Sequence, residues 1–179
     1  MIPVVPEDHD YVAFIRGINV GTAHRLSMSD LRAVFESIGC TDVRTVLQSG
    51  NVACRATVSE TTLVAAANEA FTASFGYGGD IVVRTPGELA TLTARNPYLA
   101  VEPDGTKVHV AFANTAPTKA AVGALDPQHA APDEFVVDGR EVFIHFPDGA
   151  GRSKLKLTLG VPVTMRNWKT VLKMQALFA

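Results

Sequence analysis

The order of hydrophobic patterns along this chain is repeated, and the repetition limits the folds that it can adopt. Segments typical of strands and helices follow one another as β-α-β-β-α-β over residues 11–84, and the same order begins again at residue 108. Alternating or continuous apolar runs of roughly four to eight residues predict the strands, and apolar residues spaced three and four apart predict the helices.

The first half carries clear helix start signals. Ser27-Met28-Ser29-Asp30 is a capping box, because its hydroxyl and carboxylate can satisfy free backbone N–H groups. A second helix is expected to begin near Ser59 and to end at Gly76. A third, connecting helix is expected after Thr85, where proline and glutamate occupy the favoured positions. The predicted strands of this half are 11–18, 43–47, 51–55 and 80–84.

The second half shows the same order with weaker helices. Strands are predicted at 108–112, 134–137, 141–146 and 163–166, with a type I′ turn at Asp138-Gly139. A short helix opens at Pro117, a helical turn follows Arg152, and Asn167 caps the last helix. The glycines Gly50 and Gly139 fall at matching places in the two hairpins. We therefore predict an α+β fold of two ferredoxin-like (βαββαβ) halves, with mainly antiparallel sheets and an extra C-terminal helix.

Three regions are expected along the chain. Residues 1–10 form a disordered or loosely attached tail, residues 11–96 the first ferredoxin-like half plus the connecting helix, and residues 97–179 the second half with the C-terminal helix. The N-terminus lacks the features of a signal peptide, and no apolar run approaches the roughly 18 to 20 residues of a membrane span. The two cysteines form no C-x-x-C pair. A cytoplasmic protein with reduced thiols and no membrane association is expected.

Charge is distributed unevenly along the chain. The net charge of −2 argues against a basic nucleic-acid binder. However, the last 31 residues hold six basic and no acidic side chains, whereas the first 148 hold 10 basic and 18 acidic ones. The excess of basic residues in this C-terminal segment is explained either by a basic segment packed on an acidic body or by an anion site built from that segment. Weak nucleic-acid binding through the same segment is a further alternative.

Four polar clusters lie at the ends of predicted elements. The first is Arg16-Gly17-Ile18-Asn19-Val20-Gly21, where the arginine offers a donor fork and the glycines permit close backbone approach. Its alternative explanation is a tight strand exit with Arg16 paired to a carboxylate. The second is Gln48-Ser49-Gly50-Asn51, whose serine and glycine are ordinary turn residues.

The third and fourth clusters lie in the basic segment. Gly151-Arg152-Ser153-Lys154 suits an anion at a helix start, or else represents a serine cap with solvated cations. Arg166-Asn167-Trp168-Lys169-Thr170 contains a cap and a packed anchor, which leaves Arg166 unexplained. The five histidines show no metal-ligand spacing, no catalytic triad is evident, and the aromatic pattern of RNA-recognition motifs is missing from residues 51–55. No metal and no cofactor are expected.

These motifs together resemble the DUF1697 family, bacterial proteins of unknown function. The resemblance rests on Tyr11–Gly21, Met28-x-x-Leu31, Val46–Val52 and Arg166–Val171, and it extends from about Tyr11 to the C-terminus. It implies two ferredoxin-like subdomains and supplies no activity. Two segments depart from the family pattern, Thr22-Ala23-His24-Arg25 and Ser153–Gly160. In the latter, an acidic residue usual in the family is absent.

A binding function is the main expectation from these observations. We expect a small anionic ligand, bearing a phosphate, nucleotide or carboxylate group, in a cleft between the two halves. The alternative is a structural or interaction protein whose polar motifs form an internal hydrogen-bond network. Because no general base is evident, binding is favoured over catalysis. The candidate ligand-binding residues are Arg16, Gly17, Asn19, Gly21, Gln48, Asn51, Arg152, Lys154, Arg166 and Asn167.

Overall fold

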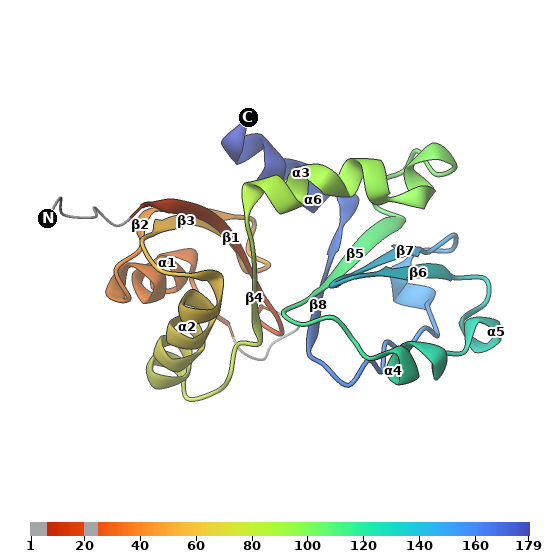
Figure 1. Cartoon of the computed structure of the whole chain (residues 1–179), viewed down its shortest axis with the longest axis horizontal. Coiled ribbons are helices and arrows are strands. Elements are labelled where there is room, and N and C mark those ends of the chain that lie inside the picture. Colours follow the sequence, from red (N-terminus) through yellow and green to blue (C-terminus); the bar gives the residue numbers. More distant parts are fainter. Residues whose placement is uncertain (1–6, 20–24) are drawn as a thin grey trace, which may run out of the picture. The chain divides into compact units, whose positions relative to one another are not determined.

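A computed structural model describes residues 7–19 and 25–179 of the chain, which divide into two compact units (Figure 1). The first unit comprises the described residues up to Glu88 together with Leu177–Ala179. The second unit is Leu89–Ala176. Each unit is built on one four-stranded sheet.

The first unit has the βαββαβ order that the sequence predicts. Its sheet has the order β2-β3-β1-β4, and every neighbouring pair is antiparallel. The elements are β1 (His9–Ile15), α1 (Met28–Ser37), β2 (Thr41–Val46), β3 (Asn51–Ala56), α2 (Glu60–Phe75) and β4 (Ile81–Arg84). In Figure 1, α1 and α2 lie on the same side of this sheet.

The second unit repeats the sheet order as β6-β7-β5-β8, again antiparallel throughout. Helix α3 (Pro86–Arg95) leads into it from the first unit. Its strands are β5 (Val108–Ala113), β6 (Glu134–Asp138), β7 (Glu141–His145) and β8 (Val163–Asn167). Its helices are α4 (Lys119–Gly123), α5 (Pro127–Ala130) and α6 (Trp168–Gln175), with the 3-10 turns η1 (Pro97–Ala100), η2 (Ala150–Arg152) and η3 (Ala176–Phe178), the last of which extends into the first unit. The predicted α+β fold of two ferredoxin-like halves with a C-terminal helix is therefore confirmed.

The registers of β1 with β3 and β4 match those of β5 with β7 and β8, whereas the β2–β3 pair has a register shift between Thr41 and Arg44 that the β6–β7 pair lacks. Val12 of β1 faces Arg84 of β4, and Val110 of β5 faces Arg166 of β8. One backbone hydrogen bond beside each hairpin is also equivalent in the two sheets. The N–H of Ile15 donates to the carbonyl of Gly50 at 2.8 Å, and the N–H of Ala113 donates to that of Arg140 at 2.9 Å.

This match corrects two expectations about the hairpins. Gly50 corresponds to Arg140 rather than to Gly139, because the first hairpin has a four-residue connection and the second a two-residue one. Gly139 has φ +63° while Arg140 does not have a positive φ. Since a type I′ turn needs positive φ at both central residues, the second hairpin has the pattern of type II′ instead.

The helix start signals form as the sequence predicts. Ser27 accepts a hydrogen bond from the N–H of Asp30. Thr85 and Glu88 form a complete capping box, in which Thr85 Oγ1 accepts from the N–H of Glu88 at 3.2 Å and Glu88 Oε2 accepts from the N–H of Thr85 at 2.8 Å. Helix α2 ends at Gly76, which has φ +75°. These contacts fix where each helix begins and ends.

Two elements differ most from the sequence prediction. Strand β1 spans His9–Ile15 instead of 11–18, and it begins at His9 because Asp10 pairs with Arg55 of β3 in register and their side chains form an ion pair at 3.1 Å. The helical turn expected after Arg152 instead ends there, as η2. The following residues 153–162 contain no helix or strand.

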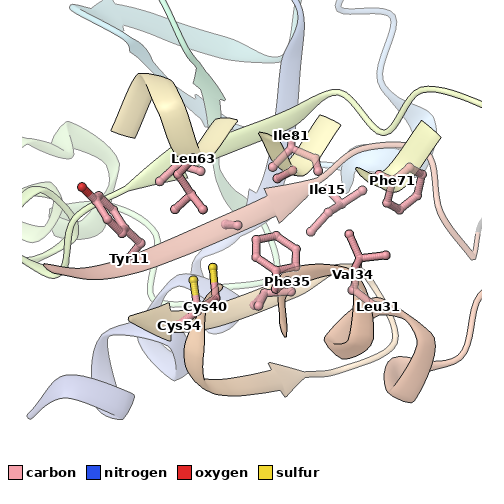
Figure 2. Close-up of a cluster of buried hydrophobic side chains, with 14 of the residues drawn as sticks. Tyr11, Ile15, Leu31, Val34, Phe35, Cys40, Cys54, Leu63, Phe71 and Ile81 are labelled. Carbon is pink, nitrogen blue, oxygen red and sulfur yellow. The ribbon is translucent and has the colours of Figure 1, made fainter. Parts of the chain in front are cut away.

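One cluster of buried side chains forms the core between the sheet and the two helices of the first unit. Figure 2 shows side chains from α1, α2 and β1 gathered in one cluster, with Phe35, Leu63 and Phe71 fully buried. Cys40 and Cys54 lie at one end of it as two reduced, buried thiols. The hydrogen bond with Cys40, together with burial, raises the pKa of the Cys54 thiol.

The corresponding face of the second sheet is covered differently. Its buried cluster is small, consisting of Ala111, Val142, Ile144, Phe146 and Leu159. The segment after η2 contributes Leu155, Leu157 and Leu159 to this cluster, while the intervening Lys156 and Thr158 are exposed. An extended segment with alternating side chains therefore takes the place that α2 holds in the first unit.

The last three residues return to the first unit. Arg44 of β2 donates a hydrogen bond to the carbonyl of Leu177 at 3.3 Å, and its guanidinium lies 5.5 Å from the ring centroid of Phe178. The chain therefore contributes to the first unit both before and after it forms the second.

Among the helices of residues 7–19 and 25–179, none has both the length and the apolar character that a bilayer span requires.

Candidate functional site

The predicted ligand-binding residues are divided between the two units. The first unit holds Arg16, Gly17, Asn19, Gln48 and Asn51, and the second holds Arg152, Lys154, Arg166 and Asn167. Gly21 lies outside the described residues.

The Asn19 side chain connects the residues that follow β1 to two other described segments of the first unit. Its backbone is left-handed, with φ 55°. Its Nδ2 donates to the carbonyls of Leu26 at 3.0 Å and Gln48 at 2.7 Å, and its Oδ1 accepts from the N–H of Leu26 at 2.8 Å. One side chain thus joins the loop after β1, the entry to α1 and the β2–β3 hairpin.

Asn51 performs a similar task inside the hairpin. It is fully buried, and its Nδ2 donates to the carbonyl of Val46 at 2.8 Å and to Ser49 Oγ at 3.0 Å. Gly50 has φ +74°, and a Cβ there would lie 2.8 Å from Ile18 Cδ1. The hairpin tip is therefore packed closely against the exit of β1, and only glycine fits at this point.

Arg16 is exposed at the end of β1. Its Nη1 lies 3.4 Å from Asp80 Oδ2, and 56% of its side chain is accessible. This is the carboxylate pairing that was the alternative to ligand binding. Gly17 has φ +74° with open space around its Cα, so it is needed there for its backbone conformation alone.

Two of the predicted residues meet at a hollow in the first unit. Asn19 and Gln48 line a space of about 400 Å³ together with Arg25, Leu26 and Ser27. Sequence reasoning identified the first two residues through their motifs. It placed Arg25 only among departures from the family pattern, because no motif marks an arginine that precedes a helix cap.

The hollow contains cationic and amide donors. Arg25 is exposed and forms no ion pair within the described residues. The side-chain amide of Gln48 likewise has no hydrogen-bond partner there, because only its backbone carbonyl is used. Ser27 lies at the N-terminus of α1, where the helix dipole favours negative charge. Asp30 opposes this effect, since its Oδ2 accepts from Ser27 Oγ at 2.6 Å.

Arg166 occupies a buried position in the second unit. Its Nη1 donates to Thr164 Oγ1 at 2.9 Å and to the carbonyl of Met165 at 2.8 Å. Burial lowers the pKa of the Arg166 guanidinium to about 10. Arg84, at the matching position of β4, is only 1% exposed, and sequence reasoning missed it. The signal was available, because each arginine stands directly before a helix cap, Thr85 or Asn167.

The remaining candidates in the second unit have different surroundings. Asn167 caps α6, with Oδ1 accepting from the N–H of Thr170 at 2.9 Å. Arg152 and Lys154 are exposed on either side of the η2 exit. Because η2 ends at Arg152, no helix starts at this cluster to direct N–H groups toward an anion. Across the part of the chain that is described, no three His, Cys, Asp or Glu side chains are grouped so that they could hold a metal ion.

Comparison with known proteins identifies similarity without an activity. The model of a family described as "Protein of unknown function (DUF1697)" matches residues 9–143. A solved structure of the conserved bacterial protein SP0830 from Streptococcus pneumoniae is similar, with a TM-score of 0.75 and 20% identity. The match covers 97% of this chain and 100% of that one. No curated protein matches.

Proposed function

Because the chain belongs to the DUF1697 family, whose function is unknown, we propose its activity from its own geometry: binding of a small anionic ligand in the hollow of the first unit. The ligand carries a terminal oxyanion, a phosphate or a carboxylate. The observation that carries the proposal is the combination of Arg25, which has no ion-pair partner among the described residues, with the unused amide of Gln48.

Each wall of the hollow contributes in a distinct way. Arg25 supplies the planar fork that suits an oxyanion, and Gln48 adds a neutral donor. Asn19 does not bind the ligand through its amide, because all three of its hydrogen bonds hold the loops that form the hollow. Since these hydrogen bonds hold Leu26 and Gln48 before binding, the ligand does not have to order these two residues, which reduces the entropic cost of association.

Titration calorimetry with inorganic phosphate and with acetate, at constant ionic strength, tests this proposal. Arg25→Ala is expected to weaken binding by about tenfold or more, since a hydrogen bond to a charged group contributes about 1.5–3 kcal/mol. Gln48→Ala is expected to have a smaller effect. Arg32→Ala is the matched control, because Arg32 is an exposed arginine of α1 that does not line the hollow.

The proposal is wrong if neither anion binds saturably, or if Arg32→Ala weakens binding as much as Arg25→Ala. The second result would mean that only the general positive potential of this surface matters. A difference between phosphate and acetate would identify which oxyanion the site accepts.

A structural role for the same motifs is the second candidate. It is favoured by the five hydrogen bonds that the Asn19 and Asn51 side chains make to the loops around them. In that case Asn19→Ala would lower the melting temperature, while Arg25→Ala and Gln48→Ala would change neither stability nor any binding. Measuring melting temperature and anion affinity on the same three variants therefore separates the two functions.

A further inference from the structure

A second hollow, of about 410 Å³, lies in the second unit and contains the opposite charge. Its walls come from η1, α5 and the residues that lead into β6. Six of the residues that line it are Tyr98, Pro127, Pro132, Asp133, Glu134 and Phe135. No residue of this hollow belongs to the first one, so the inference is independent of the proposed anion site.

Asp133 is the unusual member of this group. The residue is only 7% exposed, and its carboxylate accepts no hydrogen bond from the described residues. Its Oδ2 is completely buried without a partner. A buried carboxylate in this state is costly, because it has lost water without gaining a donor. Asp133 lines the hollow and is 7% exposed, so the accessible part of its side chain borders a space that a donor can occupy.

Two further oxygen groups lie at the same hollow. Glu134 is held by His145, whose Nδ1 lies 3.2 Å from Glu134 Oε2 and whose Nε2 lies 3.3 Å from Glu102 Oε2. The ring of Tyr98 packs against that of His145, with centroids 5.7 Å apart. Burial, with a smaller contribution from Glu134, raises the pKa of Tyr98 to about 12. Its hydroxyl therefore stays neutral at physiological pH and can accept a hydrogen bond.

The remaining walls are apolar. Phe135 and the two prolines, Pro127 and Pro132, offer carbon surface beside the oxygen groups. A volume of this size suits a small molecule rather than a single ion. An ammonium group has three donors and no acceptor, which corresponds to three acceptors from Asp133, Glu134 and Tyr98.

We propose that this hollow binds a small primary amine in its ammonium form. The ammonium group lies against the Asp133 and Glu134 carboxylates, and the alkyl part lies against Phe135 and the prolines. Binding gives the Asp133 carboxylate the donor that the protein itself does not provide.

Calorimetric titration of the whole protein with n-butylammonium chloride tests this proposal, with sodium chloride used to hold ionic strength constant. Saturable binding is expected, and 1-butanol, which has the same alkyl chain without the charge, is expected not to bind. Asp133→Asn preserves the shape of the side chain and removes its charge, so it is expected to weaken binding by about tenfold or more. Asp148→Asn is the matched control, because Asp148 is exposed in the same unit and does not line the hollow.

The melting temperature provides a second readout without ligand. Asp133→Asn is expected to raise it by about 2–4 °C, because an unpaired buried charge is removed. The proposal is overturned if wild-type protein shows no saturable binding of n-butylammonium, if 1-butanol binds equally well, or if Asp133→Asn binds as tightly as Asp148→Asn. A lower melting temperature for Asp133→Asn would also contradict it, because it would show that the carboxylate has a partner within the fold.

Discussion

The sheets of the two units have the same strand order, but different elements pack against the corresponding face of each sheet. In the first, α1 and α2 bury large side chains against one face. In the second, the corresponding face is covered by the short helix α4, through Val122, and by an extended segment that contributes alternate leucines. The strand order is nevertheless identical, and so is the register around the inner strands β1 and β5; only β2 departs, with a register shift between Thr41 and Arg44. The sheet topology therefore does not depend on helices, provided that apolar side chains cover the face at the right spacing.

On this face of the sheet, the first unit is better packed than the second. Its cluster contains two aromatic side chains with no exposed surface, Phe35 and Phe71, whereas many apolar residues around the second cluster are only half-buried. A truncated core side chain lowers the free energy of unfolding more when its surroundings cannot collapse into the cavity. The same kind of substitution should therefore be more destabilising in the tightly packed cluster of the first unit.

Phe71→Ala is expected to have the largest effect. Phe71 is fully buried in α2, and its ring makes edge-on contacts with Phe75 and Tyr77 at centroid distances of 4.8 and 5.4 Å. Its truncation should lower the free energy of unfolding by about 3–5 kcal/mol. Leu159→Ala in the second cluster should cost about 2–3 kcal/mol. Urea unfolding of both variants measures these losses. Leu63→Ala in α2, where the side chain is also fully buried, is the matched leucine substitution, and a loss no larger than that of Leu159→Ala would mean that the two faces are packed equally well.

The hairpin glycines give a second matched pair. Gly50→Ala combines strain at φ +74° with a clash against Ile18, so a loss of about 2–4 kcal/mol is expected. Gly139→Ala also has a positive φ, but the nearest atom to its Cβ would be Arg95 Nη2 at 3.9 Å. At Gly139 the substitution causes backbone strain but no clash, so the free energy of unfolding is expected to fall by about 1 kcal/mol. Thermal unfolding would refute this interpretation if the two losses were the same.

Asn51 and Glu141 occupy the same register position in the two sheets, and both are buried. Asn51→Ala removes two donated hydrogen bonds and leaves the Val46 carbonyl without this donor, at a cost of about 2 kcal/mol. Glu141→Gln weakens the contact of its Oε2 with Arg95, which keeps its bonds to Asp138, so a loss of about 1 kcal/mol in the free energy of unfolding is expected. A larger loss for Glu141→Gln in chemical unfolding would reverse this ranking.

Tyr11 and His109 form the last pair, with the smallest expected effect. The hydroxyl of Tyr11 donates to the carbonyl of Val58 at 2.9 Å, whereas Nδ1 of His109 is buried without a partner among the described residues. Burial lowers the pKa of folded His109 below its ordinary value. The unfolded chain therefore takes up the proton at a higher pH, and the free energy of unfolding should fall as the pH drops below about 6.5.

His109→Phe isolates this contribution. Stability is measured at about pH 7.5 and about pH 5.5 for wild type and variant, and the difference between the two proteins removes the effect of the other titrating groups. The variant should lose less stability on acidification than wild type. An identical loss in both proteins would mean that His109 stays neutral, or is equally protonated, in the folded and unfolded chains.

The sequence was sufficient for the fold because its strand and helix signals are local. The capping box of Thr85 and Glu88 and the glycine after α2 determine element ends through neighbouring residues alone. The extended segment 153–162 was harder to predict. Its alternating leucines and its serine and lysine residues also suit a helical turn, and only packing on the sheet decides between the two.

The candidate sites could be predicted only in part, because side-chain partners come from distant segments. The motif around Asn19 was visible, but its three hydrogen bonds to the entry of α1 and to the hairpin were not. Asp133 carries no sequence signal at all. Its burial and its lack of a donor follow from how η1 and α5 surround it, and no pattern near position 133 encodes that arrangement.

The return of residues 177–179 to β2 has a consequence for how the protein is made. During synthesis the residues of the first unit up to Glu88 are made early. The contacts of Arg44 with Leu177 and Phe178 can form only after the second unit has been synthesised, because these two residues follow it in the chain. The contacts of the Arg44 side chain on the edge strand β2 with Leu177 and Phe178 therefore form last. A ribosome-bound nascent chain that stops at residue 176 would present this edge without its final contacts, at the stage when unpaired strand edges are most prone to association.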